Sequence, residues 1–261
     1  MEAEILSYLS ADYPWKAHLH CFPELDSTNS HLKVMARQGA PHGTVLIADR
    51  QTAGHGRLGR SFHSPAASGI YLSFLLRPNC APQELMHLTC AAGVAMCDAV
   101  EKAAGFRPGI KWTNDLVYAR RKLAGILTEL SLNPAGKVDY AIIGIGINCC
   151  QQPHDFPPEI RDIACSLNIA STDRGKFAAE LIRQLYDLRQ DLFAEKALIM
   201  ECFFSRCITI GQWISILRGE AVQHGKALTV DQDGALHVLL DNGTETVVNS
   251  GEVSIRGMYG Y

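Results

Sequence analysis

Short runs of apolar residues alternate with helical stripes along the first half of the chain. The runs are bounded by turn residues and predict β-strands over residues 18–22, 44–48 and 69–76. Between the first two runs, Leu32, Met35 and Ala36 recur at helical spacing. Ser27 can cap this helix, and Gly39 ends it. A longer stripe predicts a second helix, so the pattern indicates an α+β fold with this helix over residues 83–104.

Two longer apolar runs lie in the middle of the chain, over residues 122–132 and 138–147. They flank the sequence Asn-Pro-Ala-Gly, which is typical of a turn, and therefore predict an antiparallel hairpin at the centre of the sheet. A proline-bearing loop follows over residues 151–158. A helical stripe then occupies residues 172–206.

The helical spacing ends before Gly211, and a different pattern begins. Short alternating runs predict strands over residues 214–217, 227–230, 236–239 and 246–248. Asp-Gly and Asn-Gly pairs at residues 233–234 and 242–243 predict tight turns between them. Four or five short strands within about 50 residues indicate a small β-barrel. The chain is therefore expected to have two domains, residues 1–208 and residues 209–261.

Composition and charge narrow the functional classes. Of the 261 residues, 47% are hydrophobic and 20% are charged, as in ordinary globular proteins. The net charge of −3 argues against a general nucleic-acid binder. Basic residues nevertheless gather in two stretches and could form a positive pocket for one nucleotide; they are Arg50, Arg57, Arg60, Arg107, Lys111, Arg120, Arg121 and Lys122.

The sequence also bears on compartment and redox state. Residues 1–9 lack the basic start and apolar core of a signal peptide, and no apolar run approaches the ~20 residues needed to span a bilayer. We therefore expect a cytoplasmic protein without a membrane partner. Nine cysteines without a Cys-x-x-Cys pair favour free thiols over disulfides. His18, His20 and Cys21 are more typical of a strand than of a metal site.

The glycine- and arginine-rich segment from Gly54 to Arg60 carries the most specific candidate chemistry. It reads Gly-His-Gly-Arg-Leu-Gly-Arg. Glycine lets the backbone approach a ligand closely, successive N–H groups can point into one concavity, and arginine adds fixed charge. The segment is suited to an anion, with a flexible basic loop as the alternative. It matches neither the Walker phosphate loop nor the dinucleotide-binding fingerprint.

Four other short motifs accompany this loop in a fixed order. They are Ser-Thr-Asn at 27–29, Lys-Trp-Thr-Asn-Asp at 111–115, Arg-Lys-Leu-Ala-Gly-Ile at 121–126 and Gly-Ile-Gly-Ile-Asn at 144–148. Together with the loop they resemble the biotin protein ligases, and the resemblance covers nearly the whole chain. It implies a class II synthetase-like catalytic domain, with a mixed or antiparallel sheet and helices, followed by an SH3-like β-barrel. Because fewer than 20 residues precede the first predicted strand, we expect the monofunctional type, without an N-terminal DNA-binding domain or a nucleic-acid partner.

The resemblance implies an ATP-dependent ligase. Biotin would be activated as biotinyl-5′-AMP, with release of pyrophosphate and with Mg²⁺ present. The biotinyl group would then pass to a lysine of the biotin carboxyl carrier protein domain of acetyl-CoA carboxylase. In this scheme Lys122 bridges the biotin carboxylate and the α-phosphate, and Arg57 contacts the phosphates. Asp115 completes the catalytic set and helps to hold Mg²⁺ indirectly.

Two overlapping sets of binding residues follow from the same resemblance. The biotin-binding set is Ser27, Thr28, Asn29, Gln51, His55, Gly56, Arg57, Lys122 and Gly125. The set that binds ATP and the adenylate is Arg57, Arg60, Lys111, Asn114 and Asn148.

Some alternatives stay open. Residues 27–29 could simply cap a helix, and Asn114-Asp115 could be a plain turn. A lipoate protein ligase shares the catalytic fold and the adenylation chemistry, and a non-catalytic biotin sensor is a third alternative. His55 stands where the family usually has arginine; if it touches phosphate, activity should fall more steeply above neutral pH. The sequence is also compatible with a homodimer.

Overall fold

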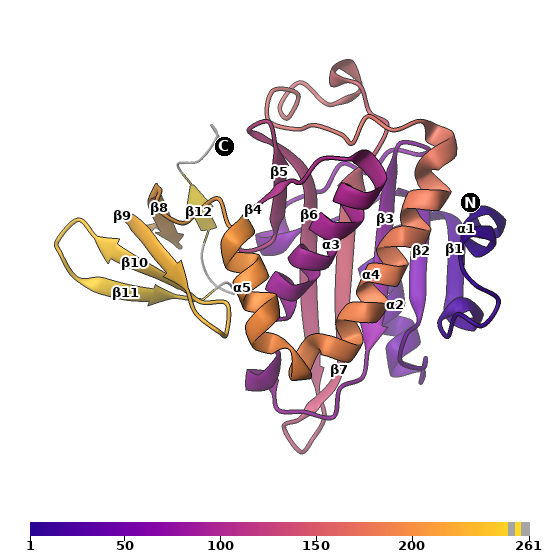
Figure 1. Cartoon of the computed structure of the whole chain (residues 1–261), viewed down its shortest axis with the longest axis horizontal. Coiled ribbons are helices and arrows are strands. Elements are labelled where there is room, and N and C mark those ends of the chain that lie inside the picture. Colours follow the sequence, from indigo (N-terminus) through magenta and orange to yellow (C-terminus); the bar gives the residue numbers. More distant parts are fainter. Residues whose placement is uncertain (250–253, 257–261) are drawn as a thin grey trace.

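A seven-stranded mixed sheet forms the centre of the larger part of the molecule (Figure 1). The computed structural model describes residues 1–249 and 254–256. In spatial order the strands are β1 (Leu19–Leu25), β2 (Val45–Gln51), β3 (Gly69–Leu76), β7 (Val138–Asn148), β6 (Arg121–Leu132), β5 (Asp115–Tyr118) and β4 (Gly109–Lys111). β1 and β2 are parallel, and the other neighbours are antiparallel. The predicted α+β fold and its central hairpin, β6–β7, are confirmed.

Helices cover both faces of this sheet. They are α1 (Glu2–Tyr8), α2 (Thr28–Arg37), α3 (Leu88–Ala104), α4 (Arg174–Ala194) and α5 (Lys196–Arg206). α3 and α4 cross one face (Figure 1), where alternate strand residues such as Ile47 and Phe74 join the main core. On the other face, Leu32 and Ala36 of α2 pack against a smaller group that includes Leu46. Because successive side chains of β2 point to opposite faces of the sheet, this strand contributes residues to both hydrophobic cores.

Two predicted helices differ from the observed ones. The helix predicted over residues 83–104 begins only at Leu88, because residues 82–85 form a 3₁₀ turn in which the Glu84 carboxylate accepts the Ala81 N–H at 2.7 Å. The helix predicted over residues 172–206 is two helices. Its chain leaves the helical region at Glu195, where φ is −112° and ψ is 25°. Neither glycine nor proline marks this break in the sequence.

A second, antiparallel sheet follows α5. Its strands, in spatial order, are β11 (Glu245–Val248), β10 (Leu236–Leu240), β9 (Ala221–Val230), β8 (Trp213–Arg218) and β12 (Ser254–Arg256). The predicted small β-rich part is therefore present. The boundary between residues 208 and 209 stays a prediction.

Three hydrogen bonds join this second part to the edge of the large sheet. The Ile208 N–H donates to the Ile110 carbonyl at 2.9 Å. The Trp112 N–H donates to the Thr209 hydroxyl at 2.9 Å, and the Trp112 indole N–H donates to the Gly234 carbonyl at 2.9 Å. Trp112 is also buried, so its ring packs where these two parts of the molecule meet.

The cysteines are all free thiols, and five of them are buried: Cys80, Cys90, Cys97, Cys149 and Cys207. Burial raises the pKa of Cys90 and of Cys97 to about 12, so neither thiol is a ready nucleophile at neutral pH. Within residues 1–249 and 254–256, none of the helices combines the length and apolar character that a membrane crossing would require.

Two glycines with positive φ after α2 provide a matched test of the packing around Trp15. A Cβ at Gly43 (φ 84°) would overlap the buried Trp15 indole, whereas a Cβ at Gly39 (φ 91°) would meet nothing within 4 Å. We expect Gly39→Ala to lower the free energy of unfolding by about 1–2 kcal/mol, the cost of a left-handed alanine. Gly43→Ala should cost about 1–3 kcal/mol more, because the indole must also move. Urea unfolding measures both, and equal losses would contradict this packing.

Candidate active site

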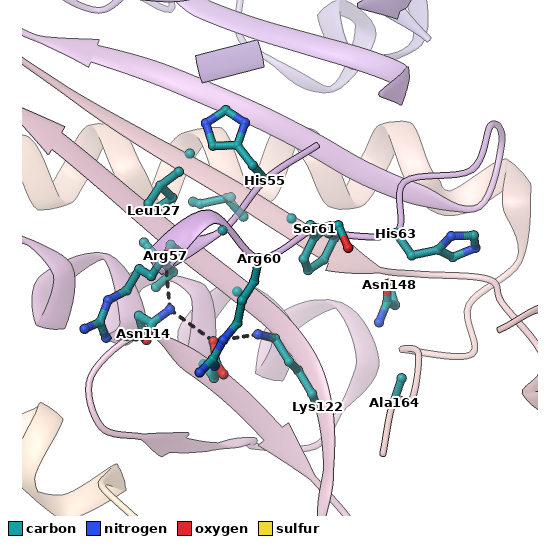
Figure 2. Close-up of a pocket in the computed structure, with 18 of the residues that line it drawn as sticks. His55, Arg57, Arg60, Ser61, His63, Asn114, Lys122, Leu127, Asn148 and Ala164 are labelled. Carbon is teal, nitrogen blue, oxygen red and sulfur yellow. Dashed lines mark hydrogen bonds and ion pairs between the residues drawn. The ribbon is translucent and has the colours of Figure 1, made fainter. Parts of the chain in front are cut away.

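A cavity of about 450 Å³ lies between the glycine-arginine loop and the sheet. Every residue of the two predicted binding sets lines it, and Figure 2 shows how several of them converge. They come from the start of α2, the end of β2, the loop after it, the β4–β5 turn and the strands β6 and β7. Residues more than 100 positions apart in the sequence, such as Ser27 and Asn148, therefore share one cavity.

Lys122 and Asp115 form an ion pair within this cavity, with 2.8 Å between Nζ and Oδ1. The antiparallel pairing of β5 and β6 places Asp115 opposite Gly125. A Cβ at Gly125 would lie 3.4 Å from the Lys122 Nζ, so glycine leaves room beside the pair. The Lys122 backbone is held as well, because its N–H donates to the Ile163 carbonyl at 2.7 Å. The lysine is thus fixed at both ends of its side chain.

Asn114 connects this ion pair to the loop. Its amide nitrogen donates to the Asp115 carboxylate at 3.1 Å and to the Ile126 carbonyl at 3.1 Å. Its amide oxygen accepts from the Arg57 guanidinium at 3.0 Å. Both ends of the Asn114 amide are therefore used to position charged groups, which is more than the plain turn that was its alternative.

The charge in this part of the cavity is predominantly positive. Burial lowers the pKa of Arg57, Asp115 opposes this shift, and Arg60 reinforces it. Arginine nevertheless stays protonated in proteins. Among the described residues that line the cavity, Asp115 is the one carboxylate, against the four cations Arg57, Arg60, Lys111 and Lys122. A site with this imbalance favours an anionic ligand.

The glycine-arginine loop folds back on itself as a short hairpin. The Gly56 N–H donates to the Arg60 carbonyl at 2.7 Å, and the Phe62 N–H donates to the Gly54 carbonyl at 2.8 Å. The turn requires positive φ at Leu58 and Gly59. These N–H groups are used inside the hairpin and do not form the anion-binding concavity that the glycines suggested. The loop offers an anion its arginine side chains instead, and Figure 2 shows Arg60 pointing towards the Lys122–Asn114 group.

His55 does not join this cationic group. Figure 2 shows its ring pointing away from Lys122 and Asn114. Its Nδ1 lies 3.3 Å from the Ala53 carbonyl oxygen. His55 lines the cavity as predicted, but a contact with phosphate would require the ring to turn, so the hypothesis about its pH effect gains no support from this geometry.

The start of α2 forms the other end of the cavity. The Ser27 side chain accepts from the Ser30 N–H at 3.5 Å, so it serves as the helix cap. The Thr28 N–H donates to Gln51 Oε1 at 2.9 Å, and Gln51 Nε2 donates to the Ser64 hydroxyl at 3.1 Å. Asn29 reaches across the sheet to Glu129. This end is built from neutral polar groups and therefore suits an uncharged polar ligand group.

Asn148 lies at the end of β7 with its side chain already partnered. Its amide nitrogen donates to the Cys165 carbonyl at 2.9 Å, and its amide oxygen accepts from Gln151 at 3.3 Å. These bonds hold the segment after residue 148 against the cavity.

Part of the cavity wall was not predicted. Phe156, Ile160, Ile163 and Ala164 line it, although the sequence indicated only a proline-bearing loop over residues 151–158. Apolar residues in a loop were an available signal, since a loop side chain that is not exposed must pack somewhere, but their order gave no pattern: Phe156 is extended, with φ −80° and ψ 140°. Ser73 and Glu129, which hold Asn29, gave no such signal, because a serine and a glutamate within strands are ordinary.

Comparisons with known proteins agree with this geometry. The chain matches the Biotin/lipoate A/B protein ligase family over residues 21–148 and the Biotin protein ligase C terminal domain over residues 209–256. The bifunctional ligase/repressor BirA of Bacillus subtilis is 35% identical over 240 residues, which are 89% of this chain and 73% of that protein. A biotin--[acetyl-CoA-carboxylase] ligase of Mycobacterium tuberculosis is 33% identical over 248 residues, which are 93% of this chain and 90% of that protein.

A solved structure shows the same architecture. The biotin protein ligase from Aquifex aeolicus, in complex with biotin and ATP, is 31% identical, with a TM-score of 0.76 over 92% of this chain and 98% of that one. The two family models fall on the two sheets described above, and the relatives extend along about nine tenths of the sequence. The chain therefore belongs to the biotin protein ligases of the biotin/lipoate protein ligase family.

Proposed function

We propose that this protein is an ATP-dependent biotin protein ligase. It activates biotin as biotinyl-5′-AMP and then transfers the biotinyl group to a lysine of a biotin carboxyl carrier protein domain. The observation that carries this proposal is the ion pair of Lys122 with Asp115, set among three further cations at one end of a cavity whose other end is neutral and polar. A ligand with an anionic end and an uncharged polar head fits this arrangement.

The first step joins two anions. A biotin carboxylate oxygen attacks the α-phosphorus of ATP, the bond from that phosphorus to the bridging oxygen breaks, and pyrophosphate leaves. The electrostatic cost is the approach of the carboxylate to the phosphates, and fixed positive groups reduce it. In this proposal Lys122 bridges the carboxylate and the α-phosphate, and its ion pair with Asp115 holds it in the cavity before the substrates bind. Arg57 and Arg60 neutralise the phosphates from the loop.

The second step transfers the acyl group. The lysine amine of the carrier attacks the acyl carbon of the mixed anhydride, the bond from that carbon to the phosphate oxygen breaks, and AMP leaves. Water would compete for the same carbon. The loop hairpin lies over the cavity, and its exposed tip at Leu58 could close further over the bound adenylate.

Magnesium fits the site as a companion of ATP. The described residues contain no cluster of three or more His, Cys, Asp or Glu side chains that could hold a metal alone. Mg²⁺ in nucleotide sites is commonly held by one or two carboxylates, water and the substrate phosphates. Asp115 is the one carboxylate among the described residues that line the cavity, and it would help to hold the ion indirectly, while the ion would offset phosphate charge. Cytoplasmic ATP and the carrier domain of acetyl-CoA carboxylase complete the partners that we propose.

Pyrophosphate exchange into ATP tests the first step directly. We expect exchange with biotin and Mg²⁺ and none with lipoate or without an acid, because the neutral polar end of the cavity matches a ureido ring. Radiolabelled pyrophosphate provides the measurement. Exchange with lipoate instead of biotin would move the protein to the lipoate ligases, and absence of exchange with either acid would contradict ligase activity.

Replacement of Lys122 separates chemistry from binding. Lys122→Met should reduce biotin-dependent exchange by about 100-fold or more, since the charge that bridges the reacting anions is lost. Biotin binding, measured by calorimetry without ATP, should persist. Lys137→Met is the matched control, because Lys137 is exposed at the β6–β7 turn. A Lys122→Met protein that exchanges pyrophosphate at the wild-type rate would remove Lys122 from the mechanism.

A further inference from the structure

A chain of hydrogen bonds leads from the surface of α2 to the neutral end of the cavity. Lys33 and Glu129 form an ion pair with 2.5 Å between Nζ and Oε1. The other oxygen of Glu129 accepts from the Asn29 amide nitrogen at 2.8 Å. The Ser73 hydroxyl lies 2.5 Å from Asn29 Oδ1 and 2.7 Å from the Thr28 hydroxyl. Two members of this network, Thr28 and Asn29, line the cavity, and Thr28 lies beside Gln51.

The surroundings of Asn29 fix which way its amide points. Its nitrogen faces the Glu129 carboxylate and, at 3.3 Å, the Leu127 carbonyl. Both of these groups only accept hydrogen bonds, so the amide oxygen must point the other way, towards Ser73. The approach is close: a Cβ at Gly144 would overlap Asn29 Oδ1. Glycine at position 144 therefore allows the α2 side chain to cross β7 and reach β6.

The number of hydroxyl protons in this network determines whether Thr28 donates or accepts a hydrogen bond. Asn29 Oδ1 cannot donate, so the single hydroxyl proton of Ser73 is committed to it. Two hydroxyl oxygens 2.7 Å apart need a proton between them, and this proton must come from Thr28. Gln51 Oε1 only accepts, so it competes for the same Thr28 proton, but it lies farther away, at 3.2 Å against 2.7 Å for Ser73. The Thr28 hydroxyl therefore donates inward and presents lone pairs to the cavity.

We propose that Glu129 is a positioning residue that, through Asn29 and Ser73, holds the Thr28 hydroxyl as a hydrogen-bond acceptor and so makes this end of the cavity specific for an N–H donor. The proposal rests on the proposed function, because the ureido ring of biotin supplies such a donor. Glu129 itself does not line the cavity. It acts by determining which group donates in each hydrogen bond between Asn29, Ser73 and Thr28.

A substrate analogue provides the direct test. Two cyclic carbamates are compared with biotin, each with oxygen in place of one ureido N–H, and dissociation constants are measured by calorimetry without ATP. The wild-type protein should bind one of the carbamates at least about tenfold more weakly than biotin, because an acceptor would face an acceptor. The amide that Glu129→Gln introduces can donate a hydrogen bond to Asn29, so the direction of every hydrogen bond from residue 129 to Thr28 can reverse. Its preference should shrink to about threefold or less, through weaker biotin binding and tighter carbamate binding.

Two further variants make the outcome specific. Ser73→Ala keeps Glu129 but interrupts the hydrogen bonds between Asn29 and Thr28, so it should also lose the preference for biotin over the carbamate. If a thermal melt shows that Glu129→Gln does not fold, Ser73→Ala provides the same test. Lys33→Met removes the ion pair but keeps the carboxylate, so it should retain the wild-type preference. An unchanged preference in folded Glu129→Gln, or an equal loss in Lys33→Met, would overturn the positioning role.

The same experiment distinguishes this proposal from the proposed function. A wild-type protein that binds biotin but does not discriminate between it and the carbamates overturns the role of Glu129 and leaves the ligase intact. A wild-type protein that does not bind biotin at all overturns both.

Discussion

A strip of backbone without side chains at the centre of the sheet is the constraint on which the cavity depends. Gly125 on β6 pairs with Gly146 on β7, and Gly144 pairs with the neighbouring Leu127. A Cβ at Gly146 would overlap the Phe62 ring, and one at Gly144 would overlap Asn29. The loop and the start of α2 can approach the sheet only because this strip is bare. The cavity is the space that remains between them, and Lys122 projects into it from the end of the strip.

Much of this arrangement could be predicted from the sequence, and the reasons are local. Periods of two and of about 3.6 residues placed the strands and helices, and the Asn-Pro-Ala-Gly turn placed the central hairpin. The motif residues were identified because the biotin protein ligases share them. What no local pattern could indicate was pairing across the fold. Asn29 meets Glu129 a hundred positions later. The helix also breaks at Glu195, where neither glycine nor proline marks the break.

The loop shows how glycine and arginine can contribute to one predicted binding site in different ways. Its glycines and arginines were expected to bind an anion jointly, with backbone N–H groups forming a concavity. Hydrogen bonds inside the hairpin use the N–H groups of Gly56 and Phe62, so the glycines shape the loop and the arginines carry the charge. Glycine spacing alone cannot distinguish an N–H group that faces a ligand from one that faces its own chain, because both need the same backbone freedom.

The bonds between Ile110, Trp112 and the segment at 208–209 have a consequence for solubility. β4 is the last strand of the large sheet, and an edge strand with unpaired backbone groups is a template for pairing with another chain. The Ile208 N–H donates to the Ile110 carbonyl, and the Trp112 N–H donates to the Thr209 hydroxyl, so these backbone groups are already paired. At the opposite edge, the Glu2 carboxylate accepts the Cys21 N–H of β1. The segments before and after the sheet thus occupy backbone groups at both of its edges, and fewer of these groups remain to pair with another chain.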